Sequence, residues 1–80
     1  MDPAEQFGNN LRARRRQRGL SQETLAHAAD VHTSEVSRLE RAERDPRLST
    51  IVRIAQALDI APAKLLEGIN PEAEGPKPGR

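Results

Sequence analysis

The feature that most limits the fold is a set of three residues at fixed spacing within the segment 22–41, namely Ala26, Asp30 and Val36. Two helices joined by a turn of about three or four residues cross steeply only if a small residue lies where they approach. The turn also needs a residue that accepts a positive φ, and Asp does so better than most residues. An apolar residue must then hold the second helix against the first. These positions meet the requirements in order, so the sequence predicts two closely crossed helices here.

Residues that start and stop helices predict five short helices and no strand. Asp2, Pro3 and Glu5 start the first helix, and Gly19 ends it in a left-handed conformation. The other helices are expected over 22–29, from 32 or 33 to about 41, from 49 or 50 to 58, and from 62 to a stop at 68. Apolar positions at helical spacing give the expected core: Phe7, Leu11, Leu25, Ala26, Ala29, Val36, Leu39, Ile51, Ile54, Ala55 and Leu58.

The length of 80 residues is enough for one small domain. The chain has no cysteine, one Phe and no Trp or Tyr, so aliphatic residues must fill the core without disulfide support. We expect one helical domain over 1–68 and a disordered C-terminal tail over 69–80, where Pro and Gly crowd together. No apolar run approaches the ~20 residues that span a bilayer, and the N-terminus lacks a signal-peptide pattern. A cytoplasmic protein without a membrane partner is therefore expected.

Charge is distributed unevenly, although the formal net charge is only +1. Residues 1–20 carry five Arg against two acids, whereas residues 21–43 carry five acids against Arg38 and Arg41. The basic N-terminal face could meet phosphates. The acidic middle segment counts against simple nucleic-acid binding.

The histidines and hydroxyl side chains do not suggest catalysis. His27 and His32 lie five residues apart and lack Cys or paired carboxylates at ligand spacing, so no metal site is expected. Ser37, His32 and Asp30 fall on one exposed segment, with no pocket or oxyanion donors implied. The sequence therefore predicts neither an enzyme nor a cofactor.

Three stretches of the chain carry a family resemblance: 20–26 (LSQETLA), 36–41 (VSRLER) and 58–60 (LDI). Together they resemble the phage-repressor/Cro-type (XRE-like) helix-turn-helix family, over about residues 5–67. The resemblance implies an all-α, five-helix, lambda-repressor-like bundle whose second and third helices form the DNA-binding unit. Members of this family usually act as dimeric transcription regulators.

The resemblance places the third helix, about residues 33–41, in the major groove of duplex DNA. Phosphate contact is implied for Gln22, where the free amides of a helix N-terminus favour an anion. Four cations are further candidate phosphate contacts, with a solvated or structural role as the alternative: Arg15, Arg41, Arg44 and Arg47. Base contacts are implied for the outer face of the third helix, where an arginine suits the two acceptors of guanine: Thr33, Ser34, Ser37 and Arg38.

Two acidic residues near the third helix have different expected roles. Arg15 and Glu40 match an ion pair that is frequent in the family and joins the first helix to the third, so Glu40 would not repel DNA. Glu35 is expected on the exposed side of the third helix, where it accepts from a cytosine amine, pairs with Arg38, or lowers affinity. Ala42 stands where the family often has Gly.

These observations predict a sequence-specific regulator of transcription that binds double-stranded DNA, expected to be a repressor. It would act as a homodimer in the cytoplasm, associated with the nucleoid. The leucines and isoleucines of the fourth and fifth helices are expected in the core by default, and their exposed remainder could form a dimer contact, for which Ile60, Leu65 and Leu66 are the candidates. The alternative is a protein-interaction adaptor of the same fold, such as a coactivator or an antitoxin-like module, and the near-neutral charge and Glu35 favour it.

Overall fold

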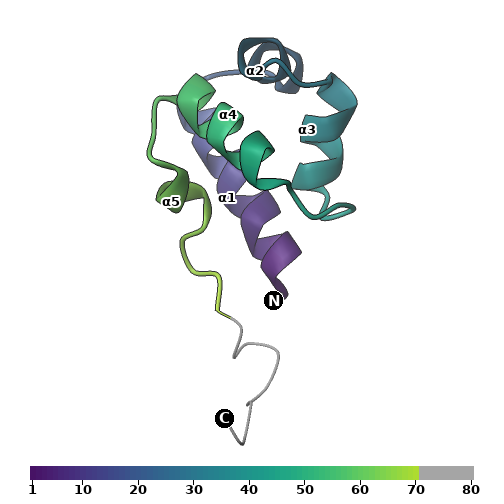
Figure 1. Cartoon of the computed structure of the whole chain (residues 1–80), viewed down its shortest axis with the longest axis vertical. Helices are drawn as coiled ribbons and strands as arrows, with labels where there is room; N and C mark the ends of the chain where they lie inside the picture. Colours follow the sequence, from purple (N-terminus) through teal and green to yellow (C-terminus); the bar gives the residue numbers. More distant parts are fainter. Residues whose placement is uncertain (71–80) are drawn as a thin grey trace, which may run out of the picture.

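The computed structural model describes residues 1–70, which fold into five helices (Figure 1). Helix α1 (Pro3–Gln17) begins at a capping box in which the Asp2 carboxylate accepts from the Glu5 amide at 2.9 Å. The Glu5 carboxylate accepts from the Asp2 amide at 3.2 Å in return. These bonds satisfy amides that the first turn of a helix leaves free. Gly19, at φ 69°, follows the end of α1 as predicted.

Helices α2 (Gln22–Ala29) and α3 (Thr33–Glu40) form the crossed pair that the spacing predicts. Ser21 caps α2, since its hydroxyl accepts from the Thr24 amide at 3.0 Å. Asp30 ends α2 at φ 60° and ψ 45°, which is the left-handed conformation that the tight turn requires. The third helix ends one residue earlier than predicted.

Helices α4 (Leu48–Leu58) and α5 (Pro62–Leu65) complete the bundle. The start of α4 was predicted at Ser49 or Thr50, because hydroxyl residues usually cap helices. It begins earlier, after Arg47, whose side chain makes no capping hydrogen bond. With only four residues, α5 is shorter than predicted.

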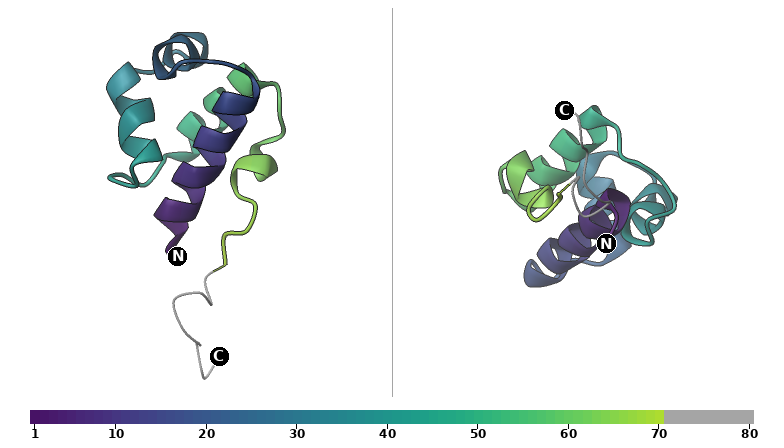
Figure 2. Two further views of the ribbon diagram at one scale, coloured as in Figure 1. Left: turned by 180° about the vertical axis from the view of Figure 1, so that it is seen from behind. Right: turned by 90° about the horizontal axis from the view of Figure 1, so that it is seen from below.

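The core lies where α2 packs on α3 and α4, and where α1 packs on α3 and α5. Figure 2 shows α2 across one end of the bundle, with the N-terminus and the last described residues toward the other end. The apolar residues expected at helical spacing are all buried, and Leu65 takes the core position that is the default for the leucines of the last helix: Phe7, Leu11, Leu25, Ala26, Ala29, Val36, Leu39, Ile51, Ile54, Ala55, Leu58 and Leu65.

Gly8 sets the close approach of α1 and α3. A Cβ atom at this position would lie 2.6 Å from the carbonyl oxygen of Leu39 and 2.8 Å from that of Glu40. Only hydrogen fits there, so the helices approach closely. Arg12 and Arg15 lie four and seven residues after Gly8 on the same side of α1, and are thereby brought beside α3. This role of Gly8 was not predicted, although a glycine inside a helical pattern often has a packing reason.

The C-terminal part of the described chain corrects one prediction. Leu65 is 0% exposed and belongs to the core, so the expectation that it contacts a second copy is wrong. Ile60 is half-buried, and Leu66 remains 43% exposed. Ile69 packs against the core from within the segment that was expected to be a tail. The remainder of that segment, 71–80, lies outside the described residues.

Candidate nucleic-acid interface

The polar side chains of α3 face away from the bundle. The opposite side of the helix is sealed, because Val36 and Leu39 are each 0% exposed. The four residues with predicted base contacts form the outer face of α3: Thr33, Ser34, Ser37 and Arg38. Ser37 is half-buried, and the other three are exposed. This face is presented by a helix that cannot turn without opening the core.

The crossing of α2 and α3 fixes the direction of that face. Ala26 is 1% exposed, and its carbonyl accepts from the amide of Val31 at 3.0 Å. Val36 is buried behind it, and Asp30 makes the turn between the helices. The three spaced residues therefore do what the sequence predicted of them, and α3 projects its outer face as a rigid unit.

A buried carboxylate ties α3 to α1 and α2. The Glu40 side chain is 0% exposed and pairs with Arg15, whose Nε lies 2.6 Å from Oε2. Arg15 Nη2 also donates to Oε1 at 3.0 Å, and Gln22 Nε2 donates to the same oxygen at 2.9 Å. Arg12 Nε adds a longer contact at 3.4 Å. We call these four residues the Glu40 network; the Arg12 and Gln22 links were not predicted.

The Glu40 network sets the ionisation of its members. Burial by itself raises the pKa of Glu40, but the hydrogen bonds from Arg15 and Gln22 and the charge of Arg15 outweigh it and lower that pKa below its ordinary value. The hydrogen bond to Glu40 raises the pKa of Arg15 in turn. The charge of Glu40 is thus buried and neutralised inside the bundle. One of the five acids of residues 21–43 therefore does not count against DNA binding.

Two predicted phosphate contacts belong to this network. Arg15 is largely enclosed, with 11% of its side chain exposed. Its Nη1 donates to the carbonyl of Leu20 at 2.8 Å, so every guanidinium nitrogen has a partner within the bundle. A structural role is the one that this geometry supports for Arg15. Gln22 differs, because its amide nitrogen carries two hydrogens and the hydrogen bond to Glu40 uses only one.

Arg41 lies at the C-terminal end of α3, where it is the cap residue. Its Nε and Nη2 donate to the Glu43 carboxylate at 2.9 and 3.1 Å, and its Nη1 donates to the hydroxyl of Ser37. Ser37 is therefore held by its own helix. Arg41 remains half-exposed beside the outer face of α3.

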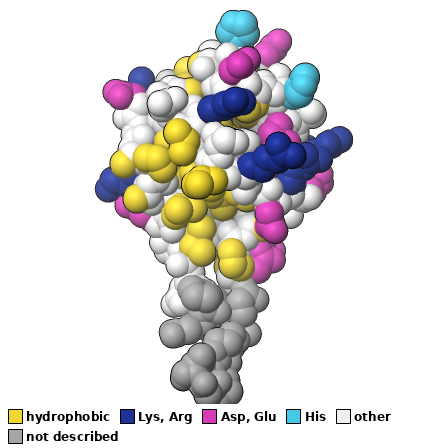
Figure 3. Space-filling view, in the orientation of Figure 1, with side chains coloured by type: hydrophobic (Ala, Val, Ile, Leu, Met, Phe, Trp, Pro, Cys, Tyr) yellow, Lys and Arg dark blue, Asp and Glu magenta, His cyan; other side chains and the backbone are white. Residues whose placement is uncertain are grey.

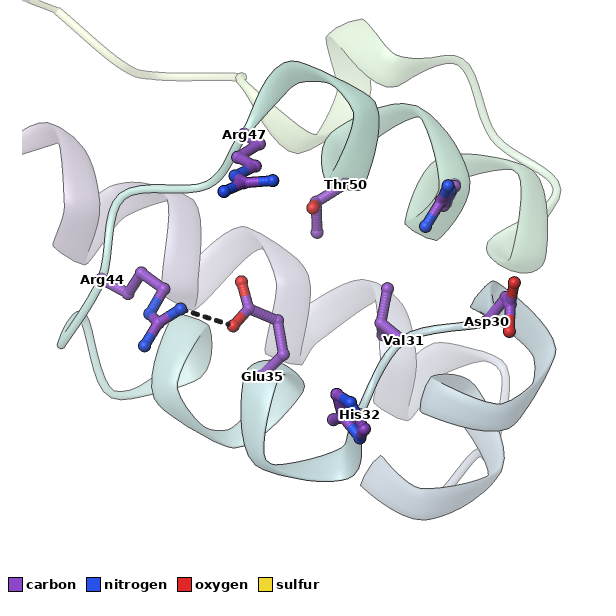
Figure 4. Close-up of a pocket in the computed structure, with 8 residues that line it drawn as sticks. Asp30, Val31, His32, Glu35, Arg44, Arg47 and Thr50 are labelled. Atoms are coloured by element: carbon purple, nitrogen blue, oxygen red, sulfur yellow. Dashed lines mark ion pairs between the residues drawn. The ribbon is translucent and has the colours of Figure 1, made fainter.

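A groove of about 270 Å³ separates the start of α3 from α4 (Figure 4). Glu35 extends from α3 into this groove, and Arg44 reaches it from the loop that follows α3. The two side chains form an ion pair, with Arg44 Nη1 3.2 Å from Glu35 Oε1. The expectation that Glu35 faces outward is wrong, since only 19% of its side chain is exposed and its partner is Arg44 rather than Arg38.

Three arginines near the outer face of α3 and the groove have no ion-pair partner among the described residues. Within residues 1–70, Arg38, Arg47 and Arg53 enter no ion pair. Arg38 belongs to the outer face of α3, whereas Arg47 and Arg53 line the groove. Arg53 was not among the residues predicted to contact DNA.

In the part of the chain that the structure describes, no group of three or more His, Cys, Asp or Glu side chains is placed to hold a metal ion. No helix there is long and apolar enough to cross a bilayer.

A bundle in which the buried side of α2 and a buried carboxylate hold α3 with its polar face outward defines a helix-turn-helix domain. Residues 11–65 match the family HTH_3, described as helix-turn-helix. The chain belongs to this family.

Relatives and solved structures agree with that assignment. The sequence is 39% identical over 66 residues to control protein C.SmaI of Serratia marcescens, which covers 82% of this chain and 79% of the relative. The restriction-modification controller protein C.AhdI from Aeromonas hydrophila has a similar structure, with a TM-score of 0.76, 44% identity, and 78% of this chain and 94% of that chain covered. The P22 c2 repressor in complex with synthetic operator 9T has a TM-score of 0.71 at 31% identity. The match covers 78% of this chain and 94% of the repressor chain.

Proposed function

We propose that this protein binds duplex DNA in a sequence-specific manner and regulates transcription as a repressor. The observation that carries the proposal is the rigid outward display of the outer face of α3, held by the buried side of the helix and by the Glu40 network. An α-helix of this kind fits the major groove, where base edges are distinguishable. The cytoplasm, where the nucleoid lies, is the corresponding place of action.

The contacts divide into two groups. Base contacts are assigned to Thr33, Ser34, Ser37 and Arg38; the guanidinium of Arg38, which enters no ion pair within residues 1–70, matches guanine O6 and N7. The proposed phosphate contacts lie around this face and use the second hydrogen of the Gln22 amide together with three cations: Arg41, Arg44 and Arg47.

The known proteins support the same class. P22 c2 repressor is described in complex with an operator, and C.SmaI and C.AhdI are described as control or controller proteins. The matched region covers 94% of the C.AhdI chain. Control of a restriction–modification system is therefore the regulatory setting that we propose.

The direct test is a fluorescence anisotropy titration of labelled random-sequence duplex at two or more salt concentrations. Each neutralised phosphate contributes a slope of about −0.9 in log affinity against log salt. Arg41 and Arg47, with or without Arg44, whose charge the ion pair with Glu35 offsets, therefore predict a slope between about −2 and −3 per protomer. Binding that is absent or insensitive to salt would contradict the proposal and favour the protein-interaction adaptor.

The surface also supports the proposal that the chain acts as a homodimer. Three large apolar side chains are exposed on α4 and just beyond α5: Leu48 (76%), Val52 (37%) and Leu66 (43%). Figure 3 shows apolar side chains gathered on the side of the molecule where α4 and α5 lie. Apolar patches of this kind mark interaction sites. Pairing two copies would place two recognition helices ~34–36 Å apart along one side of the duplex.

Substituting Leu66 by glutamate tests the dimer. Full burial of a leucine contributes about 1.5–3 kcal/mol, so Leu66→Glu should weaken self-association by roughly tenfold to a hundredfold. Sedimentation equilibrium measures this change. Ala13→Glu, at an exposed position on α1, is the matched control and should not alter it. Equal association constants for both variants would place the dimer contact elsewhere.

A further inference from the structure

The groove between α3 and α4 contains an acid among several cations. Its lining includes Glu35 from α3, Arg44 from the following loop, and Arg47, Thr50 and Arg53 from the start and middle of α4. Figure 4 shows the carboxylate of Glu35 turned toward Arg44 and α4, away from the outer face of α3. The position of Glu35 in the first turn of the proposed recognition helix places this acid beside the proposed path of DNA.

The ion pair in the groove is loose in comparison with the Glu40 network. Arg44 Nη1 and Glu35 Oε1 are 3.2 Å apart, and 48% of the Arg44 side chain is exposed. Within residues 1–70 no side chain donates a hydrogen bond to the Glu35 carboxylate, and Arg44 is its one ion-pair partner, whereas three side chains donate hydrogen bonds to Glu40. Arg44 is therefore accessible to solvent and held by one partner, which another anion with suitably placed oxygen acceptors can replace.

A DNA phosphate is such an anion. A guanidinium binds carboxylate and phosphate oxygens with the same donor geometry. Arg47 and Arg53 line the same groove without an ion pair of their own among the described residues. Glu35 thus cancels one positive charge of a cluster that would otherwise attract phosphates more strongly.

We propose that Glu35 is an internal competitor for the DNA backbone, which holds Arg44 in the free protein and thereby limits the affinity of the chain for all duplexes. This inference rests on the proposed function, because it concerns the same DNA-binding surface. It assigns Glu35 a role in setting affinity rather than in reading a base. Since every duplex offers the same phosphates, the effect does not depend on base sequence.

The variant Glu35→Gln removes the charge and keeps the shape of the side chain. It should bind random-sequence duplex roughly three- to tenfold more tightly than the native chain at about 0.1 M salt, with a salt slope steeper by up to about 0.9. Adding Arg44→Gln should return both the affinity and the slope to near the native values. Glu67→Gln is the matched control, because it removes an exposed acid that pairs with Arg14 and Lys64 away from the groove.

The experiment separates this inference from the proposed function. If the native chain shows salt-dependent binding and Glu35→Gln binds no more tightly than it, only the inference is overturned. Equal affinity would mean that Glu35 has no effect on binding, and weaker binding by the variant would mean that Glu35 positions Arg44. A gain that survives in the double variant, or that Glu67→Gln also shows, overturns it as a general charge effect. Absence of binding by the native chain and all variants overturns the proposed function as well. Thermal melting followed by circular dichroism checks that each variant is folded.

Discussion

Replacing Glu40 by alanine is expected to lower the free energy of unfolding by about 2–4 kcal/mol, because removal of one partner from a buried ion pair leaves the other uncompensated. The value falls at the lower end of such effects because Arg12 is 38% exposed and regains water. Chemical denaturation of the purified chain measures the change. Glu43→Ala is the matched control: Glu43 is half-exposed, so loss of its ion pair should change the free energy of unfolding far less than Glu40→Ala does.

The coupling within the Glu40 network gives the same prediction a second test. The effects of Arg15→Ala and Glu40→Ala should not add, because each removes the other's partner; an interaction energy above about 1 kcal/mol is expected. Additive effects would show that the two side chains act independently.

The lowered pKa of Glu40 also makes the stabilisation by the Glu40 network depend on pH. Because that pKa is lower in the folded chain than in the unfolded chain, the contribution is complete above the ordinary glutamate value of about 4.3. It is lost as the pH falls through the lower, folded value. The difference in stability between the native chain and Glu40→Gln should therefore shrink at acid pH, and a constant difference would contradict the assignment.

Replacing Arg38 by alanine is expected to relax base preference. A bidentate contact to guanine contributes about 1–3 kcal/mol of discrimination, so the variant should lose roughly 5- to 150-fold in the ratio of affinities for its preferred site and for random duplex. Selection of binding sites from random duplexes supplies the preferred sequence. Anisotropy titrations of that site and its single-base variants then measure the ratio.

The matched control for Arg38 is Arg16→Ala. Arg16 is an exposed arginine on α1 that enters no ion pair within residues 1–70. Loss of this charge should leave the ratio unchanged. If Arg38→Ala weakens binding equally on every sequence, the side chain contacts a phosphate instead of a base.

The sequence predicted the fold and the outward face of α3 well, because both follow from local rules. A small residue, a residue at positive φ and an apolar residue at set spacing permit few alternatives to a tight crossing. Capping residues likewise located α1 and α2. Prediction failed at the start of α4, where Arg47 occupies the cap position without a capping side chain. Local rules identify a cap only when the side chain itself makes the bond.

The candidate site was less predictable because its partners come from different helices. Helical spacing offered Arg38, one turn away, as one of the alternatives for Glu35, but its partner Arg44 comes from the next loop. Nothing local could show that Gln22 and Arg12 both reach Glu40. Leu65 was a candidate for dimerisation because periodicity shows only that one side of a helix is apolar. It does not show whether another part of the same chain already covers that side.

The Glu40 network has a consequence for the rate at which the protein would find its site. The recognition helix shares one carboxylate with α1 and α2 and therefore approaches a duplex already in its final arrangement. Preorganisation of this kind spares the association step the entropy of ordering a loop or folding a segment. Encounter should then proceed as docking of a rigid body, at a rate governed by diffusion and long-range charge rather than by a slow conformational rearrangement.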